Sequence, residues 1–333
     1  MNVWKPLRRE ILKSIGGTLI TCLATQSSAA ASSFPMSFDH AFGTTAIDRV
    51  PLRVASLGFL EHDTLLALGT VPVGIKGWFQ SLPHATGPWA AHLLAGAQPV
   101  PLAGSEIPFE TLLDLEPDLI VALYTNLTQE EYDRLTSIAP TIAWTRAAGP
   151  WGMFWEDTAR LLGRILDRET RAEELIANVH ETYRSLRERY PRLAGARGIA
   201  GNSAGDTFVV RGPRYDTGAL MVGLGIECPA EILAYIGTST LAHFSWEQVS
   251  LIGHGLDVIL WDVHGDGNVS AMARRMDMLG VYPGEKRIVF NSAVSMVSMA
   301  MASQSVLSIP FAAELIAPRL AAAIDGKAAV QVN

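Results

Sequence analysis

A pattern that occurs twice constrains the fold of this chain more than any other feature of its sequence. Residues 109–123 and 246–261 each begin as a short amphipathic helix with a glutamate in the first turn, Glu110 in one copy and Glu247 in the other. Each copy then breaks sharply and enters an apolar strand that starts with an aspartate. Because repeated strand–helix units are typical of paired structural modules, the pattern predicts two similar lobes, each with one glutamate in the same place.

A shorter signature precedes each copy in the same order. At residues 68–72 and 224–229, a Leu-Gly pair is followed within four residues by a proline. The two signatures together strengthen the prediction of two lobes. One glutamate at the same place on each lobe further suggests two matched contact points for a partner protein.

The first 31 residues are predicted to be an export signal that is removed from the mature protein. They carry four basic residues, and residues 8–13 resemble a twin-arginine signal. The apolar stretch that follows is too short to span a bilayer. Ala29 and Ala31 have the spacing of a signal-peptidase site, so we expect cleavage near Ala31 and a periplasmic protein. A lipid anchor on Cys22 is the alternative, although the threonine before it fits a lipoprotein signal poorly.

Size and charge limit the classes of function. Removal of 31 residues from 333 leaves 302, which suits two domains of about 100–150 residues. The whole chain has a formal net charge of −7, and the leader has a net charge of +3, so the mature chain has a net charge near −10. A protein this acidic is not suited to binding the phosphates of nucleic acid. Cys228 is the one cysteine outside the leader, so no intrachain disulfide is expected and the apolar core must hold the fold.

Short apolar runs alternate with helical patterns in both halves of the chain, which predicts parallel sheets with strands buried on both faces. Residues 32–50 lack periodicity and are predicted to form an extended arm. We place the N-terminal lobe at 51–166 and the C-terminal lobe at 192–326. The predicted strands are residues 53–57, 71–75, 118–123, 141–144, 207–210, 256–261 and 287–290.

A long helix is predicted between the lobes, within residues 167–191. Apolar residues recur there at helical spacing, a capping box is expected at Thr170–Glu173, and Pro191 ends the pattern. A helix of about 20 residues is roughly 30 Å long, and therefore a stiff connector. A second capping box is predicted at residues 128–131, and a closing helix at 311–324.

Three successive segments of the chain resemble the ferric-siderophore branch of the ABC-transporter substrate-binding proteins. The best match within that branch is the ferrichrome/hydroxamate type. The three segments are residues 53–57 (RVASL), 65–74 (LLALGTVPVG), and Glu110 with 115–120 (LEPDLI). The resemblance covers nearly the whole mature chain. It implies an α/β protein with two Rossmann-like lobes joined by a single long α-helix, the helical-backbone metal/siderophore receptor type, with the ligand in the cleft between the lobes.

The resemblance also implies the function and the partners. The protein would capture a ferric siderophore and deliver it, as a monomer, to an ABC permease in the inner membrane. Glu110 and Glu247 would meet arginines of that permease. No catalysis, no resident cofactor and no protein–metal bond are expected, because the chelator already fills the coordination shell of the iron.

Parallel sheets of this kind bind ligands beyond the carboxyl ends of their strands. Aromatic faces there would cover an apolar chelate, and arginines would donate paired hydrogen bonds to its oxygens. The same rule places Phe59, Glu61 and His62 after the first strand and Lys76 after the second. The nine cleft candidates are Trp78, Tyr124, Arg146, Trp151, Arg211, Arg214, Tyr215, Ser239 and His264.

The sequence departs from the ferrichrome type in one respect. Members of that type carry an arginine shortly before the first docking glutamate, and residues 102–106 contain none. The usual aromatic before the second docking glutamate is also not evident at residues 238–240. Either another arginine substitutes, or the ligand is a different chelate; haem, cobalamin and zinc are alternatives for the same fold.

Two features of the sequence are consistent with functions other than transport. Residues 201–205 match the G-x-S-x-G elbow of serine hydrolases, with Ser203 as the nucleophile, although a strand pattern rather than a helix follows. His62 with Tyr124 could hold a haem iron. A zinc site would draw on separate loops, since none of the histidines has local ligand spacing; the candidates are His62, His243, His254 and His264.

Overall fold

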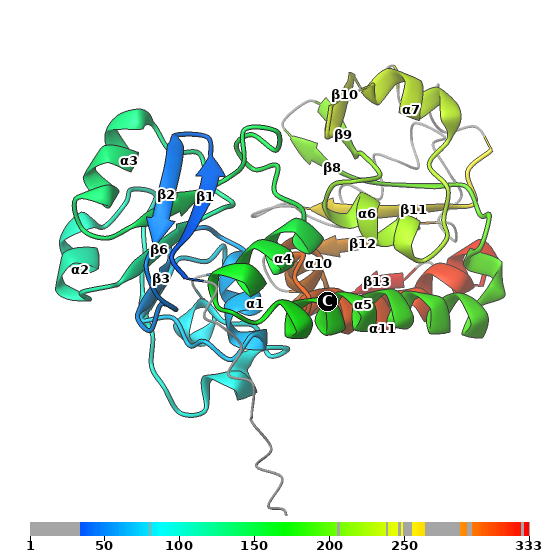
Figure 1. The fold of residues 1–333 in the computed structure, drawn as a ribbon. Helices are drawn as coiled ribbons and strands as arrows, with labels where there is room; N and C mark the ends of the chain where they lie inside the picture. The colour runs from blue at the N-terminus through cyan, green and yellow to red at the C-terminus, as the bar shows by residue number, and fades with distance from the viewer. Residues whose placement is uncertain are drawn as a thin grey trace, which may run out of the picture. The chain divides into compact units, whose positions relative to one another are not determined.

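The computed structural model describes residues 34–79, 81–204, 207–237, 239–245, 248, 255–263, 287–291, 295–327 and 330–332. The predicted export signal, Cys22, Glu247, His254 and His264 lie outside these residues. Within them, no helix has the length and apolar character needed to cross a membrane. Phe34–Asn333 forms one unit, in which two lobes are joined by the helix α5 (Figure 1).

The N-terminal lobe is built on a five-stranded parallel sheet in the order β5-β4-β3-β6-β7. Strands β3, β6 and β7 are buried along their whole length, which explains their uninterrupted apolar runs. The strands are β3 (Val54–Ser56), β4 (Gly74–Ile75), β5 (Val100–Pro101), β6 (Leu119–Ala122) and β7 (Thr141–Ala143). The helices are α1 (Glu61–Ala67), η1 (Pro83–Ala85), η2 (Ala91–Leu94), α2 (Phe109–Asp114), α3 (Gln129–Thr136) and α4 (Trp155–Ile165). The capping box predicted at 128–131 is confirmed at the start of α3.

The C-terminal lobe has a six-stranded sheet in the order β10-β9-β8-β11-β12-β13. Its β8–β9 and β9–β10 pairs are antiparallel, so the parallel sheet expected from the sequence holds only for β8, β11, β12 and β13. The strands are β8 (Gly198–Ala204), β9 (Thr207–Arg211), β10 (Leu241–Ser245), β11 (Val258–Val263), β12 (Arg287–Asn291) and β13 (Val330–Val332). The helices are η3 (Pro191–Leu193), α6 (Asp216–Gly223), α7 (Ala230–Ile236), α10 (Met296–Ser303) and α11 (Ser308–Ile324). The predicted closing helix is confirmed as α11.

The extended arm predicted for residues 32–50 is instead a β-hairpin. Strands β1 (Met36–His40) and β2 (Gly43–Ile47) pair antiparallel, and every second side chain is buried. The hairpin docks on the N-terminal lobe: Thr45 Oγ1 donates a hydrogen bond to the Thr141 carbonyl at 2.8 Å, and the Phe42 ring stacks on Tyr132. The alternation was hidden in the sequence because histidine and threonine occupy the buried positions His40 and Thr45.

The long helix between the lobes is confirmed as α5 (Glu169–Arg189). Its buried stripe consists of Ala172, Leu175, Ile176, Val179, Tyr183 and Leu186, the residues whose spacing predicted the helix. The capping box predicted at Thr170–Glu173 is wrong. Helix α4 ends with Asp167 at positive φ and with the Arg168 N–H bonded to the Gly163 carbonyl, so α5 begins immediately afterwards and Thr170 is already helical.

The Leu-Gly pair and the aspartate of the sequence repeat have the same structural role in both lobes. Helices α1 and α6 each end in a Schellman motif, with Gly69 and Gly225 at positive φ, where a residue other than glycine is disfavoured. The repeated aspartates also correspond. The Asp118 carboxylate accepts a hydrogen bond from the Arg53 N–H at 2.7 Å, and the Asp257 carboxylate accepts one from the Arg197 N–H at 2.9 Å. Each aspartate therefore connects the starts of two neighbouring strands, β6 with β3 in one lobe and β11 with β8 in the other.

Arginines at the two ends of α5 connect the helix to both lobes. The Arg168 guanidinium donates to the Leu68 carbonyl at the end of α1, and the Arg187 guanidinium to the Gly223 carbonyl at the end of α6. A cation is favoured at the C-terminal end of a helix, where the last carbonyls lack partners. The equivalent helices of the two lobes are therefore both anchored to the connector.

We expect Arg187→Ala to lower the free energy of unfolding by about 1–2 kcal/mol, because the last carbonyls of α6 lose a charged donor. Chemical denaturation measures the change. Arg192→Ala is the control: that side chain is 73% exposed and should matter by less than about 0.5 kcal/mol. Equal effects of the two changes would contradict the anchoring role of Arg187.

Candidate functional site

A cavity of about 610 Å³ opens on the N-terminal lobe beyond the carboxyl ends of its strands. The loops after β3, β4, β5 and β6 all contribute to its lining, as the topology of a parallel sheet predicts. The lining residues most suited to ligand contact are Phe59, Lys76, Trp78, Ser105, Thr125 and Trp151.

Aromatic rings form one wall of this cavity. Phe59 and Trp78 stack with centroids 4.1 Å apart, and the Trp151 ring lies 5.7 Å from each of them. Tyr124 meets Trp151 edge-on at 5.4 Å. Trp78 remains 46% exposed, so part of its ring is free to contact another molecule. Two of the nine cleft candidates, Trp78 and Trp151, therefore line this wall with Phe59, and a third, Tyr124, packs against Trp151.

Lys76 supplies a positive charge in the same cavity. Its Nζ donates a hydrogen bond to the Glu106 carbonyl at 2.8 Å and lies 5.6 Å from the centre of the Phe59 ring. Burial lowers the pKa of Lys76, and the nearby Glu131 carboxylate opposes that shift. No arginine lines the cavity among the residues that the structure describes, so Lys76 is the cation best placed to meet an anionic ligand there.

The two lobes make contact through another pair of candidates. The hydroxyl of Tyr124, in the loop after β6, donates a hydrogen bond to the hydroxyl of Tyr215, which precedes α6, at 3.0 Å. The Arg211 guanidinium lies 5.4 Å from the centre of the Tyr215 ring. Tyr124 and Tyr215 therefore face each other between the lobes, with a positive charge beside Tyr215.

Three other candidates lie elsewhere. Arg146 is exposed and does not line the cavity. It lies near His40, whose pKa is lowered first by burial and then by the positive charge of Arg146. The Arg214 guanidinium lies over the Phe154 ring and lines a second cavity, of about 500 Å³, beside α4, α5 and α6. Ser239 is exposed, and its hydroxyl accepts from the Leu241 N–H, as in a turn. These placements do not support cleft contacts for Arg146 or Ser239.

Glu61 follows the first strand, but its side chain lies in the core. One carboxylate oxygen accepts hydrogen bonds from the Leu123 and Tyr124 N–H groups at 2.5 and 3.2 Å, and the other from the Leu60 N–H at 3.0 Å. Burial raises the pKa of Glu61, and these backbone donors oppose that shift. The sequence rule failed because every residue of α1 is buried. Glu61 instead holds together the two loops that present Phe59 and Tyr124.

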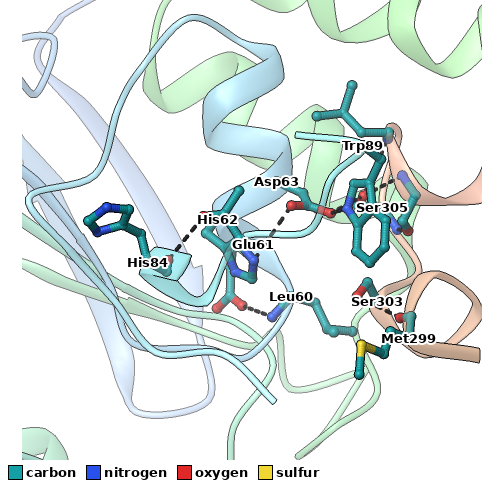
Figure 2. A network of polar contacts seen from close by, with 12 residues as sticks. Leu60, Glu61, His62, Asp63, His84, Trp89, Met299, Ser303 and Ser305 are labelled. Atoms are coloured by element: carbon teal, nitrogen blue, oxygen red, sulfur yellow. Dashed lines mark hydrogen bonds and ion pairs between the residues drawn. The ribbon is translucent and has the colours of Figure 1, made fainter. Parts of the chain in front are cut away.

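Asp63 lies in a second buried network, shown in Figure 2. Its Oδ2 accepts from Trp89 Nε1 at 2.6 Å and from the Ser305 hydroxyl at 2.7 Å. The Ser305 hydroxyl also accepts from the Ser308 N–H at the start of α11. Asp63 belongs to α1 and Ser305 to the segment between α10 and α11, so this carboxylate joins the N-terminal lobe to the helix that closes the C-terminal lobe.

His62 lies beside this network. It is 5% exposed, its Nε2 lies 3.5 Å from Asp63 Oδ1, and its Nδ1 has no hydrogen-bond partner among the described residues. Burial lowers the pKa of His62, against the raising effect of the Asp63 carboxylate. His243 is exposed on β10. In the described ranges, no three His, Cys, Asp or Glu side chains lie close enough to hold a metal ion.

The buried His62 predicts a loss of stability in acid. Because its folded pKa is lowered, the unfolded chain binds the proton more readily, so stability is present above the unfolded value near 6.5 and falls as the pH drops below it. We expect His62→Gln to lose less stability than the wild type between about pH 7.5 and about pH 5, measured by urea denaturation at each pH. The exposed His92→Gln should keep the wild-type pH dependence. An unchanged pH profile in His62→Gln would contradict the prediction.

The structure describes one of the two glutamates predicted to dock on a permease. Glu110 is exposed in the first turn of α2 and lines a surface hollow together with Phe109, Glu131 and Arg134. Glu247 lies outside the described residues. The exposure of Glu110 leaves it accessible to a partner, and its docking role stays a prediction.

The backbone around Ser203 does not form a nucleophile elbow. An elbow places the serine in a sharp turn between a strand and a helix. Ser203 instead lies within β8 and pairs with Phe208 of the antiparallel strand β9. The first four residues of the G-x-S-x-G match, 201–204, therefore belong to a strand paired antiparallel with β9.

Residues 54–276 match the periplasmic binding protein family. The chain is 30% identical over 179 residues to the probable siderophore-binding lipoprotein YfiY of Bacillus subtilis, covering 51% of each chain. The chain spans about half the length of the curated relatives it matches.

Two solved structures match over most of their length. A periplasmic solute binding protein from Mycobacterium smegmatis is 28% identical with a TM-score of 0.71, covering 86% of this chain and 98% of the other. The iron uptake ABC transporter substrate-binding protein PiaA from Streptococcus pneumoniae is 25% identical with a TM-score of 0.74, covering 87% of this chain and 100% of the other.

Proposed function

This chain belongs to the periplasmic binding protein family, and from that premise we propose that it captures a ferric siderophore and delivers it to an ABC importer. The fold of two lobes joined by one long helix, which the sequence predicted, is the framework of the proposal. The family is one of binding proteins rather than enzymes, so we propose no catalytic step and no resident cofactor. Export into the periplasm is part of the proposal.

The observation that carries the proposal is the aromatic wall of the 610 Å³ cavity. Phe59, Trp78 and Trp151 offer broad faces to the apolar part of a chelate, and Lys76 offers a cation to its oxygens. The probable siderophore-binding relative and the iron-uptake protein support iron chelates as the ligand class. Lys76 takes the place, in this proposal, of the arginine that residues 102–106 lack.

Quenching of tryptophan fluorescence tests the proposal, because two tryptophans line the cavity. Purified protein is titrated with ferric hydroxamates, ferric catecholates, ferric citrate, haemin, cobalamin and Zn²⁺. We expect saturable quenching by at least one ferric siderophore, with an affinity in the micromolar range or tighter. Preference for haemin, cobalamin or Zn²⁺ would replace the siderophore with that ligand. No binding across the panel would refute the proposal.

The docking glutamates make a separate prediction. We expect Glu110→Ala combined with Glu247→Ala to retain ligand binding but to abolish uptake of radioiron–siderophore by cells, because charge pairs orient a complex more than they strengthen it. Glu130→Ala with Glu174→Ala removes two other exposed glutamates and should leave uptake intact. Loss of ligand binding in the Glu110 and Glu247 double variant would argue against docking.

A further inference from the structure

Glu131 is the one carboxylate among the described residues that line the 610 Å³ cavity. We propose that Glu131 selects the cargo by charge, and that the preferred ligand is a ferric chelate with a neutral iron centre and a protonated amine on its outer part. This inference rests on the proposed capture of ferric siderophores, and it narrows that ligand class to cationic chelates.

One oxygen of the Glu131 carboxylate is available to a ligand. The Oε2 atom accepts hydrogen bonds from the Thr128 N–H at 2.7 Å and from the Thr128 hydroxyl at 3.0 Å, within the capping box of α3. The residues that the structure describes donate no hydrogen bond to Oε1. Because Glu131 is half-buried, a charged donor at Oε1 would be shorter and stronger than a neutral one, which favours a ligand ammonium.

Glu131 stands at the border between two hollows. It lines the 610 Å³ cavity and also the surface hollow that contains Glu110, and Ile107 lines both in the same way. A chelate whose iron centre rests against the aromatic wall can therefore extend an arm to this border. The carboxylate is placed to meet the end of such an arm rather than the iron centre.

The positive charges near Glu131 already have other partners. The Lys76 Nζ donates to the Glu106 carbonyl, and the Arg134 guanidinium lies 3.6 Å from the centre of an aromatic ring. Lys76 is near enough for its charge to interact with that of Glu131, but neither it nor Arg134 forms an ion pair with Glu131. Glu106 and Glu110 line the adjoining hollow, so three carboxylates outnumber two cations around the two hollows.

The rest of the cavity lining disfavours a strongly anionic cargo. Lys76 is the one cation among its described residues, and its charge does no more than balance that of Glu131. A chelate with several negative charges would find no surplus positive charge there. A cationic chelate gains the Glu131 carboxylate and also the faces of Trp78 and Trp151, because indole rings attract cations.

A matched pair of ligands tests the proposal. Ferrioxamine B is a linear ferric trihydroxamate with a neutral iron centre and a terminal primary amine, which is protonated at pH 7. Its N-acetyl derivative has the same iron centre and an uncharged end. We expect isothermal titration calorimetry to show that the wild type binds ferrioxamine B about tenfold more tightly than the acetyl derivative.

Glu131→Gln removes the charge without removing the helix cap, because glutamine also serves at this position of a capping box. We expect this variant to bind the two ligands equally, through a loss of affinity for ferrioxamine B alone. Glu130→Gln is the matched control: it removes the neighbouring glutamate of α3, which is exposed and does not line the cavity, and should keep the tenfold preference. Addition of salt should reduce the preference of the wild type.

Equal binding of the two ligands by the wild type would overturn the inference. A preference for ferrioxamine B that survives in Glu131→Gln would overturn it too, since another group would then recognise the amine. A loss of affinity for both ligands in Glu131→Gln would show a structural role for Glu131 and not a selective one.

The outcomes also distinguish this inference from the proposed function. If the wild type binds both trihydroxamates equally, or binds only anionic ferric chelates, charge selection by Glu131 fails and siderophore capture stands. If it binds no ferric chelate of any charge, both proposals fail.

Discussion

Trp78→Ala is expected to weaken binding of the ferric siderophore by about a hundredfold, or about 2–3 kcal/mol. Trp78 stacks on Phe59 and stays 46% exposed, so its free face is available to a ligand. A ligand can bury at most this exposed part, about half of the 150–250 Å² of a tryptophan, which at about 25 cal/mol per Å² gives about 2–3 kcal/mol, the size of the expected loss. Isothermal titration calorimetry measures the affinity without relying on the tryptophan that has been removed.

Tyr235→Ala is the matched control for this prediction. Tyr235 is also a large aromatic residue with a mostly exposed ring, 55% accessible, but it lies on α7 and packs against Phe244. We expect its replacement to change the affinity by less than about twofold, as for surface residues outside a contact region. If both variants bind as tightly as the wild type, the aromatic wall is not the binding surface.

Asp63→Ala is expected to have the largest effect on stability, with a loss of about 3–5 kcal/mol in the free energy of unfolding. The carboxylate is fully buried and accepts two short hydrogen bonds, from Trp89 and Ser305. Its removal leaves a buried indole N–H and a buried hydroxyl without their acceptor, which costs far more than the loss of a surface charge. Urea denaturation followed by circular dichroism measures the change.

A double-mutant cycle tests whether Asp63 couples the two lobes. We expect Asp63→Ala and Ser305→Ala to be non-additive by about 1–3 kcal/mol, because both remove the same hydrogen bond. Asp48→Ala, at an exposed carboxylate on the N-terminal lobe, should cost less than about 0.5 kcal/mol and add independently to Ser305→Ala. Strict additivity of Asp63 and Ser305 would show that the contact does not hold the lobes together.

Local patterns predicted the framework of the protein well. The spacing of apolar residues within 172–186 predicted the buried face of α5, because residues three and four positions apart lie on the same face of a helix. The repeated aspartates Asp118 and Asp257 marked equivalent strand starts. The β8 strand was missed since its glycines and polar residues, such as Asn202, carry no apolar run, and its burial depends on neighbours from other parts of the chain.

The sequence alone determined that two strand–helix lobes flank a stiff helix, and that aromatic residues follow the strands of the first lobe. Periodicity and turn chemistry are local, so they can be read one segment at a time. Only the tertiary structure decided which side chains after those strands face the cavity. In the folded chain, Phe59, Trp78 and Trp151 line one cavity. The side chains of Glu61 and Asp63 are buried, and Arg146 is exposed outside the cavity. Those outcomes depend on packing between segments distant in sequence, such as Asp63 against Ser305 and Tyr124 against Tyr215, and no local pattern encodes them.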